Sequence, residues 1–223
     1  MTRRYAGAVE AALLDLYDTV ARTHWGRFSD AIAAELGIDK RQLYRAYEVT
    51  RSARAVGTFG DQAGDMRAVV EAAGLEARPA LIDRLVAMEV EFARTGVELW
   101  EDARPVVGRL RERGVKTALI SNCSHSTRPI VDRLGLEDLF DAIVLSFEVG
   151  SHKPDPAIYL EALRRLGGVA PERAVFVDDQ TGYCDGAAAL GIGALLIARD
   201  GLDDIEADGY RVIRDLGPLL ALE

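Results

Sequence analysis

Four charged side chains that could act together in catalysis come after short apolar runs. They are Asp15, Lys153 and the neighbouring pair Asp178 and Asp179. A carboxylate can attack phosphorus or carbon, or hold a divalent cation, and an ammonium group stabilises negative charge that develops during a reaction. This combination of residue types is more typical of a reactive site than of packing.

The apolar runs have the length of buried parallel strands. Residues with helical spacing lie between them, and such alternation predicts a doubly wound, Rossmann-like α/β core around a parallel sheet. Glu10 is out of place in the first run. Ligands of these sheets bind beyond the carboxyl ends of the strands, so the polar residues there are the first candidates for a site. The predicted strands are residues 9–14, 115–120, 142–146, 174–177 and 192–197.

A long segment between the first two strands breaks this rhythm. It shows only helical periodicity, and breaks containing glycine or proline divide it into about four helices. We therefore predict an inserted helical-bundle cap domain over residues 22–99 and an α/β core domain formed by residues 1–21 and 100–223.

Composition restricts the class of partner. The formal charge of -9 opposes nucleic-acid binding, which requires a basic surface, and favours a small-molecule substrate. No apolar run approaches the roughly 18 residues of a membrane span. Two cysteines, Cys123 and Cys184, are too few for a disulfide framework. We expect a cytoplasmic protein that binds neither membrane nor nucleic acid.

Four segments resemble, in order and spacing, the motifs of the haloacid-dehalogenase-like family, over about residues 8–198. The resemblance implies a hydrolase that forms an aspartyl-enzyme intermediate, and the helical insert resembles the cap domain of that family. The segments are Asp15-Leu16-Tyr17-Asp18-Thr19, Ser121-Asn122, Lys153-Pro154-Asp155-Pro156 and Asp178-Asp179.

The resemblance also implies catalytic roles. Asp15 is the expected nucleophile, Thr19 and Ser121 are expected to hydrogen-bond the transferring group, and Asn122 completes the second motif. Lys153 is expected to neutralise charge beside the nucleophile, because a positioned ammonium both lowers a carboxyl pKa and stabilises developing negative charge.

A Mg²⁺ site follows from the same resemblance. Its implied ligands are Asp15, Asp179 and the backbone carbonyl of Tyr17, and oxygen ligands of this kind suit the ion. Without a metal the three carboxylates would repel one another, and at least one should be protonated. Asp178 is left between two roles, a structural hydrogen-bond acceptor or a member of the reactive site.

Two residues depart from the phosphatase pattern. Tyr17 stands where phosphatases carry a second Asp that protonates the leaving group, and a tyrosine with a pKa near about 10 is a poor general base. Asp18 is not expected to replace it, because neighbours in an extended segment point in opposite directions. Tyr183 stands where the family often has Asp or Asn, and Asp185 is expected to face solvent.

Three functions remain open. We favour a Mg²⁺-dependent phosphatase for a small phosphorylated metabolite with a good leaving group. Tyr17 also resembles the L-2-haloacid dehalogenase branch, which needs no metal, and Tyr159 resembles a residue of that branch, although simple packing explains it too. Asp178 and Asp179 argue against dehalogenation, because that branch has small neutral residues there. The third alternative is a catalytically weak protein that binds a ligand or a partner.

Selectivity should come from the cap, but its residues do not identify the substrate. Basic residues there could attract an anionic substrate, although each charged helix residue is more often simply solvated. The cap candidates are Arg22, His24, Arg27, Arg51 and Arg54.

Two further histidines, His125 and His152, lie beside the second and third motifs. The sequence does not settle the oligomeric state.

Overall fold

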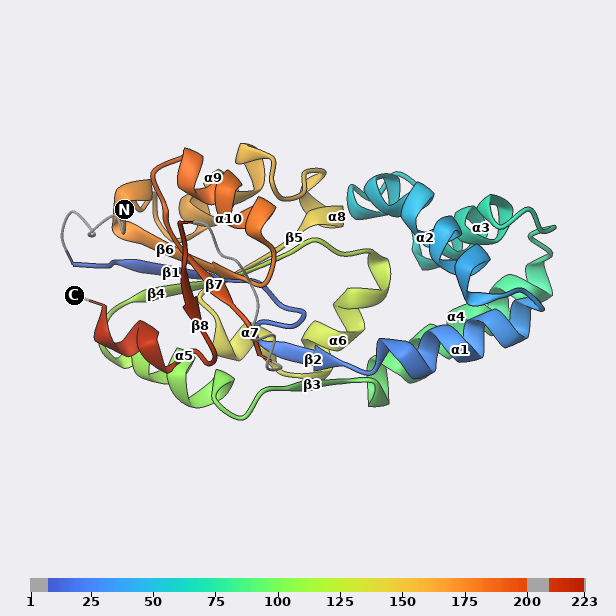
Figure 1. The fold of residues 1–223 in the computed structure, drawn as a ribbon, viewed down its shortest axis with the longest axis horizontal. Helices are drawn as coiled ribbons and strands as arrows, with labels where there is room; N and C mark the ends of the chain where they lie inside the picture. The colour runs from blue at the N-terminus through green and yellow to red at the C-terminus, as the bar shows by residue number, and fades with distance from the viewer. Residues whose placement is uncertain (1–7, 200–208, 223) are drawn as a thin grey trace.

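The computed structural model describes residues 8–199 and 209–222. Its centre is a six-stranded sheet in the order β5-β4-β1-β6-β7-β8, and all five neighbouring pairs run parallel (Figure 1). This agrees with the predicted doubly wound α/β core. The strands are β1 (Ala11–Leu14), β4 (Lys116–Ser121), β5 (Ala142–Leu145), β6 (Ala174–Asp178), β7 (Gly193–Ile197) and β8 (Arg211–Ile213).

Helices cover both faces of the sheet, which explains why its central strands are largely apolar. Ala12 and Leu14 of β1 pack into one hydrophobic cluster, and Ala11 and Leu13 pack into another on the opposite face. In Figure 1 the helices α9 and α10 lie above the sheet, and α5 lies below it. The elements of this part are α5 (Ala103–Glu112), η1 (His125–Thr127), α6 (Arg128–Arg133), α7 (Leu136–Leu139), α8 (Ser146–Val149), α9 (Pro156–Arg165), η2 (Pro171–Arg173), α10 (Thr181–Ala189) and η3 (Gly217–Ala221).

The structure differs from the predicted strands in two places. Glu10 precedes β1 instead of lying inside the first strand, and its carboxylate pairs with Arg173 at 2.7 Å. This removes the conflict of a charge inside a buried strand. Strand β8 was not predicted, because it has three residues and only Ile213 is buried, so it carries no strong apolar pattern.

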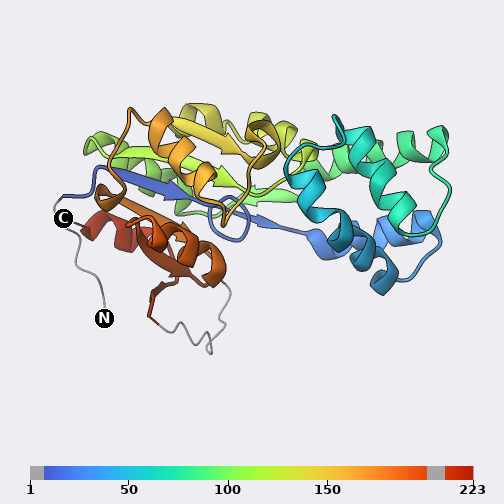
Figure 2. The same cartoon turned by 90° about the horizontal axis from the view of Figure 1, so that it is seen from above.

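Four helices form a separate bundle at one end of the molecule, beyond the sheet (Figures 1 and 2). They bury a third hydrophobic cluster that includes Ile32, Leu43 and Leu85. The side chains of Asp39 and Asp61 accept backbone hydrogen bonds at the starts of two of these helices, as N-caps do. The helices are α1 (Trp25–Leu36), α2 (Lys40–Ala55), α3 (Gln62–Ala72) and α4 (Pro79–Thr95).

The segment predicted as purely helical also contains two short strands. β2 (Ala21–Thr23) and β3 (Val97–Leu99) pair in antiparallel fashion where the chain enters and leaves the bundle. Three-residue strands are too short to give a periodic pattern, so the sequence did not reveal them. We propose that this ribbon is the boundary between the core and cap domains.

A buried arginine holds the core end of both connections. Arg199 donates hydrogen bonds to the carbonyl of Thr19 at 2.6 and 2.9 Å, and it binds both oxygens of Asp102 at 2.8 Å. Asp102 also accepts the backbone N–H of Leu216. The backbone that carries Thr19 is therefore fixed. In the described part of the chain, every helix is too short or too polar to cross a lipid bilayer.

Candidate active site

Lys153 lies between two buried carboxylates at the carboxyl ends of the central strands. Its Nζ lies 2.5 Å from Oδ1 of Asp15 and 2.6 Å from Oδ2 of Asp178, and it donates to the carbonyl of Ile120 at 3.2 Å. All three charged side chains are less than 10% exposed. The structure thus brings together residues that lie 138 and 25 positions apart in the sequence.

Neighbouring strand ends hold this lysine in place. The side chain of Asn122, just after β4, donates to the carbonyl of Lys153 at 2.8 Å and accepts its N–H at 2.7 Å. Oδ1 of Asp178 accepts the N–H of Gln180 at 2.8 Å. Asn122 therefore positions the lysine backbone, and Asp178 is both a hydrogen-bond acceptor and a member of the charged cluster.

A third carboxylate completes a group that could hold a metal. Oxygens of Asp15, Asp178 and Asp179 all lie within 4.8 Å of one another. The cluster holds three carboxylates and the ammonium of Lys153, so when fully ionised it carries an excess of two negative charges. A cluster of oxygen donors with this excess fits a divalent cation such as Mg²⁺.

Burial, together with the charges inside the cluster, shifts the pKa values of its members. Burial raises the pKa of Asp15, and the negative charge of Asp178 adds to this effect, while Lys153 opposes it. Burial likewise raises the pKa of Asp178. Burial lowers the pKa of Lys153, but attraction by the two carboxylates outweighs it and the pKa is raised. The lysine is therefore protonated, and one ammonium does not fully compensate the carboxylates.

Two buried hydroxyl groups near the cluster lack partners. Oγ1 of Thr19 and Oγ of Ser121 have no hydrogen bond among the residues that the structure describes, and both residues are fully buried. A buried hydroxyl without a partner costs free energy, so such groups are typically satisfied by a ligand or water. Thr19 follows Asp15 by four residues, and Ser121 ends β4.

Tyr17 is poorly suited to acid–base catalysis. Its hydroxyl shares a 2.9 Å hydrogen bond with Thr127 of η1. Burial raises the pKa of this phenol well above its ordinary value. The neighbouring Asp18 is exposed, and the extended segment that was predicted for it is wrong, because its φ of 58° places it in a left-handed turn.

Tyr183 occupies the other position that departs from the phosphatase pattern. Its ring centre lies 5.1 Å from Nζ of Lys153, and its hydroxyl accepts a 3.4 Å hydrogen bond from Arg51 of the cap helix α2. Tyr159 is buried against Phe176 and donates to the carbonyl of Tyr183 at 2.7 Å, which agrees with a packing role. Asp185 is exposed, as predicted.

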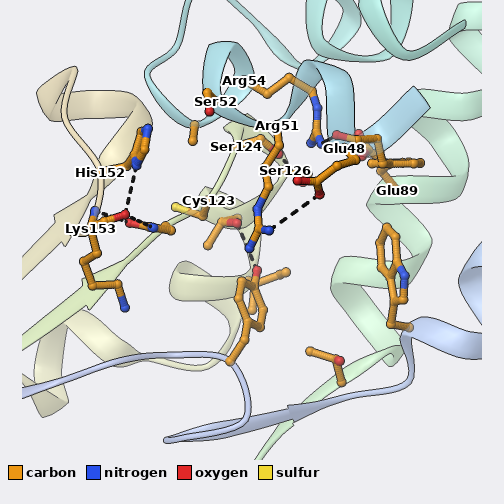
Figure 3. A pocket seen from close by; sticks show the side chains of 18 of the residues that line it. Glu48, Arg51, Ser52, Arg54, Glu89, Cys123, Ser124, Ser126, His152 and Lys153 are labelled. Atoms are coloured by element: carbon orange, nitrogen blue, oxygen red, sulfur yellow. Dashed lines mark hydrogen bonds and ion pairs between the residues drawn. The ribbon is translucent and has the colours of Figure 1, made fainter. Parts of the chain in front are cut away.

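A cavity of about 630 Å³ opens between the helical bundle and the sheet (Figure 3). Lys153 and Asn122 line its sheet side, and Arg51 and Arg54 line its bundle side. Asp15 is not among the lining residues, but its Oδ1 lies 2.5 Å from Nζ of Lys153, which is one of them.

The other predicted cap and motif residues are divided. His152 lines the cavity, whereas Arg22, His24 and Arg27 do not. Arg22 and His24 instead bind Glu98 of β3 on the surface.

The cysteines beside the site are structural. Cys123 is buried and lines the cavity, and burial raises the pKa of its thiol to about 11. Burial also raises the pKa of Cys184. Because the thiolate is the reactive form, neither residue is activated as a nucleophile.

Glu89 and Thr127 are site residues that the sequence reasoning missed. Glu89 of α4 lines the cavity and is 6% exposed. The buried positions of α4 are Ile82, Leu85, Glu89 and Ala93, so a carboxylate at apolar helical spacing was the available signal. Thr127 gave no signal, because its bond to Tyr17 spans 110 residues.

Glu89 predicts a pH-dependent stability. Burial raises its pKa from 4.5 to about 7, although a hydrogen bond from Gln62 opposes the shift. The stability that its protonated form contributes is therefore complete below about pH 4.5 and is lost as the pH rises through about 7.

We expect the free energy of unfolding of Glu89→Gln, relative to wild type, to rise by about 2 kcal/mol from pH 5 to pH 8. Denaturant unfolding at both pH values measures it. Glu91→Gln, on the exposed side of the same helix, should show no such rise. An equal response of both variants would contradict the assignment to Glu89.

Comparisons with known proteins place the chain among hydrolases. Residues 9–191 match the family model of the haloacid dehalogenase-like hydrolases. A phosphatase of Mycobacterium tuberculosis is 35% identical over 125 residues, which are 55% of each chain, so this match spans about half of that relative. A glyceraldehyde 3-phosphate phosphatase of Methanopyrus kandleri is 29% identical over 209 residues, 89% of this chain and 88% of the other.

A solved structure shares the fold over nearly the whole chain. The 2-haloacid dehalogenase of Pseudomonas syringae pv. Tomato DC3000 matches with a TM-score of 0.72 and 24% identity, covering 96% of this chain and 97% of the other. At that identity the likeness concerns the fold alone.

Proposed function

The chain belongs to the haloacid dehalogenase-like hydrolase family, and from this membership we propose that it is a Mg²⁺-dependent phosphatase of a small, anionic phosphorylated metabolite. The observation that carries the proposal is the charged cluster, in which Asp15 and Asp178 pair with the ammonium of Lys153 and Asp179 adds a third carboxylate beside them. A metal-free site has no use for the excess negative charge, which would repel an anionic substrate.

In the proposed reaction a carboxylate oxygen of Asp15 attacks phosphorus. The bond between phosphorus and the leaving oxygen breaks, that oxygen keeps the electron pair, and water then hydrolyses the aspartyl phosphate. The unpartnered hydroxyls of Thr19 and Ser121 would donate to the phosphoryl oxygens, and Lys153 would stabilise the charge that develops on them.

Asp15, Asp179 and the carbonyl of Tyr17 would hold Mg²⁺, which supplies positive charge beside the transferring phosphoryl group. Asp178 keeps Lys153 oriented. The high pKa of Tyr17 makes this phenol a poor proton donor, so we expect faster turnover of acyl phosphates than of alkyl phosphate esters.

Mg²⁺ dependence is the first test. Treatment with a chelator should reduce acetyl phosphate hydrolysis at least about a hundredfold, and added Mg²⁺ should restore it. Asp179→Asn should weaken Mg²⁺ binding at least about tenfold, because a ligand is lost. Calorimetric titration with the metal alone measures this without relying on turnover.

The exposed Asp185 provides a matched control on helix α10. Asp185→Asn should leave the Mg²⁺ affinity unchanged. Hydrolysis that is equal with and without Mg²⁺, or absent in both, would overturn the proposal.

Tyr17 favours a second candidate, a metal-independent L-2-haloacid dehalogenase, because halide leaves without a proton. In that reaction water would attack the ester formed on Asp15, so turnover in heavy-oxygen water would label the Asp15 carboxylate. The phosphatase proposal expects no chloride release from L-2-chloropropionate and no label on Asp15. Either signal would favour the dehalogenase.

The proposal includes a cytoplasmic location. Both described cysteines are free and buried, which suits a reducing compartment.

A further inference from the structure

The cavity is much larger than a small acyl phosphate or a triose phosphate requires. Its volume of about 630 Å³ falls in the range of pockets that enclose drug-sized ligands, about 300 to 1,000 Å³. It extends from Lys153 on the sheet side to Arg54 and Glu89 on the bundle side (Figure 3). The volume beyond the phosphoryl group is thus available to a bulky leaving group.

Aromatic rings dominate the bundle side of this cavity. Trp25 meets Tyr47 edge to face at 5.2 Å between ring centres and Phe92 at 6.2 Å, and Phe28 stacks on Phe92 at 4.5 Å. All four line the cavity. Tyr17 and Tyr183 continue the aromatic lining towards Lys153. Flat rings bind well against such surfaces, by stacking or by edge-to-face contact.

This wall also carries polar groups that are not fully satisfied by the described residues. The hydroxyl of Tyr47 is shielded from solvent and has no hydrogen bond among the described residues. Arg54 bonds the carbonyl of Tyr47 and the hydroxyl of Thr50, and no described carboxylate lies within 4.0 Å of it. A ligand in the cavity could satisfy these donors, which a purely apolar lining would not offer.

Charge argues against a second phosphate at the bundle side. Arg51 lies 3.6 Å from Glu48, and Arg54 shares the wall with Glu89. Once Glu89 is ionised, above about pH 7, the two cations are matched by two carboxylates, whereas an additional anion would need an excess of positive charge. A neutral ring, with or without polar substituents, fits this balance.

The chemistry at Tyr17 restricts how the ring is attached. Its phenol is held by Thr127 and stands where a proton donor would be needed. A leaving group that departs as a stable anion needs no proton. A phosphate bound directly to a phenol or to an aromatic carboxylic acid meets this requirement, and a phosphate on an alkyl alcohol does not.

We propose that the substrate is an aryl or aroyl phosphate, whose aromatic leaving group binds in the bundle half of the cavity, against Trp25 and Tyr47. This inference rests on the proposed phosphatase function. The Asp15 oxygen forms a bond to phosphorus, the bond from phosphorus to the aryl or acyl oxygen breaks, and the leaving group departs as phenolate or carboxylate with the electron pair.

Benzoyl phosphate and acetyl phosphate form a matched pair of probes, because their leaving groups are similarly acidic and differ in the ring. We expect kcat/KM for benzoyl phosphate to exceed that for acetyl phosphate by about tenfold or more, after correction for spontaneous hydrolysis. A ratio below about twofold, with Mg²⁺-dependent hydrolysis of acetyl phosphate intact, would overturn this inference and leave the proposed function standing.

Variants locate the ring. Trp25→Leu and Tyr47→Leu should each reduce the ratio of the two kcat/KM values several-fold. Tyr210→Leu removes an aromatic residue outside the cavity and should leave the ratio unchanged. Circular dichroism establishes that each variant is folded. If both cavity variants are folded and keep the wild-type ratio, the ring does not bind there.

If the wild type hydrolyses neither phosphate, the proposed function fails and binding alone tests the cavity. Benzylphosphonate should then bind about tenfold more tightly than methylphosphonate in calorimetric titrations. Equal affinities would overturn the inference about the aromatic ligand.

Discussion

Replacing Asp15 with Asn is expected to lower kcat for acetyl phosphate by at least about 10,000-fold, with Mg²⁺ saturating. The amide is a poor nucleophile. Among the described carboxylates, Asp15 is the one that both follows β1 directly and contacts Lys153. Steady-state release of inorganic phosphate measures the loss. An Asn of similar shape keeps the volume of the site, so the effect reports on chemistry.

Asp18 supplies the matched control for this experiment. Asp18→Asn changes a carboxylate three positions away in an exposed left-handed turn, a conformation that Asn tolerates. We expect it to fold and to remain active. Asp15→Asn activity within tenfold of wild type would place the nucleophile elsewhere. Ligand binding that survives in Asp15→Asn, together with no turnover in the wild type, would favour the protein that only binds a ligand or partner.

Replacing Lys153 with Met is expected to affect both stability and turnover. Removing one partner from a buried ionic group typically costs about 3 to 5 kcal/mol, and the loss of a charge at the transferring group about a hundredfold or more in kcat. Met fills similar volume but leaves Asp15 and Asp178 without their shared cation.

The stability loss should depend on pH in a defined direction. Burial already raises the pKa of both carboxyls, and without the ammonium these pKa values rise further. Protonated carboxyls do not repel one another, so the loss should be small near pH 5 and should grow towards pH 8. Denaturant unfolding of wild type and variant at both pH values measures it.

Lys40 provides the control for a lysine in an exposed ion pair. Its Nζ lies 2.6 Å from Asp30 at the surface, and Lys40→Met should change stability by less than about 1 kcal/mol at either pH. If Lys153→Met were as stable as wild type at pH 8, the buried carboxylates of Asp15 and Asp178 would not depend on the charge of Lys153. That result would contradict the electrostatic role that we assign to this lysine.

The sheet was predictable because burial on both faces leaves a strong pattern. Five of its strands are largely apolar runs, and four of these, including β1 and β6, end at or just before a polar residue. The short strands β2, β3 and β8 were not, since each has three residues and at least one exposed or half-buried position. Tertiary contacts decide how these short strands pair, and local sequence periodicity does not.

The charged cluster was predictable in part for a related reason. Parallel strands place their carboxyl ends along one edge, so Asp15 and Asp178 were expected at the same edge, and the structure adds that their strands are direct neighbours. The aromatic wall was not predicted, because Trp25 and Phe92 are brought together by helix packing across 67 positions of the chain. A position on a helix indicates which face is buried but not which cavity that face lines.

The account centres on a phosphoryl group transferred to Asp15, and trapping that intermediate tests it most directly. Wild-type protein would be mixed with acetyl phosphate and Mg²⁺, quenched in acid and digested, and the peptides analysed by mass spectrometry. We predict that the peptide carrying Asp15 gains the mass of one phosphoryl group, and that it gains none when Mg²⁺ is withheld. Release of inorganic phosphate with no labelled Asp15 peptide at any quench time would contradict the account.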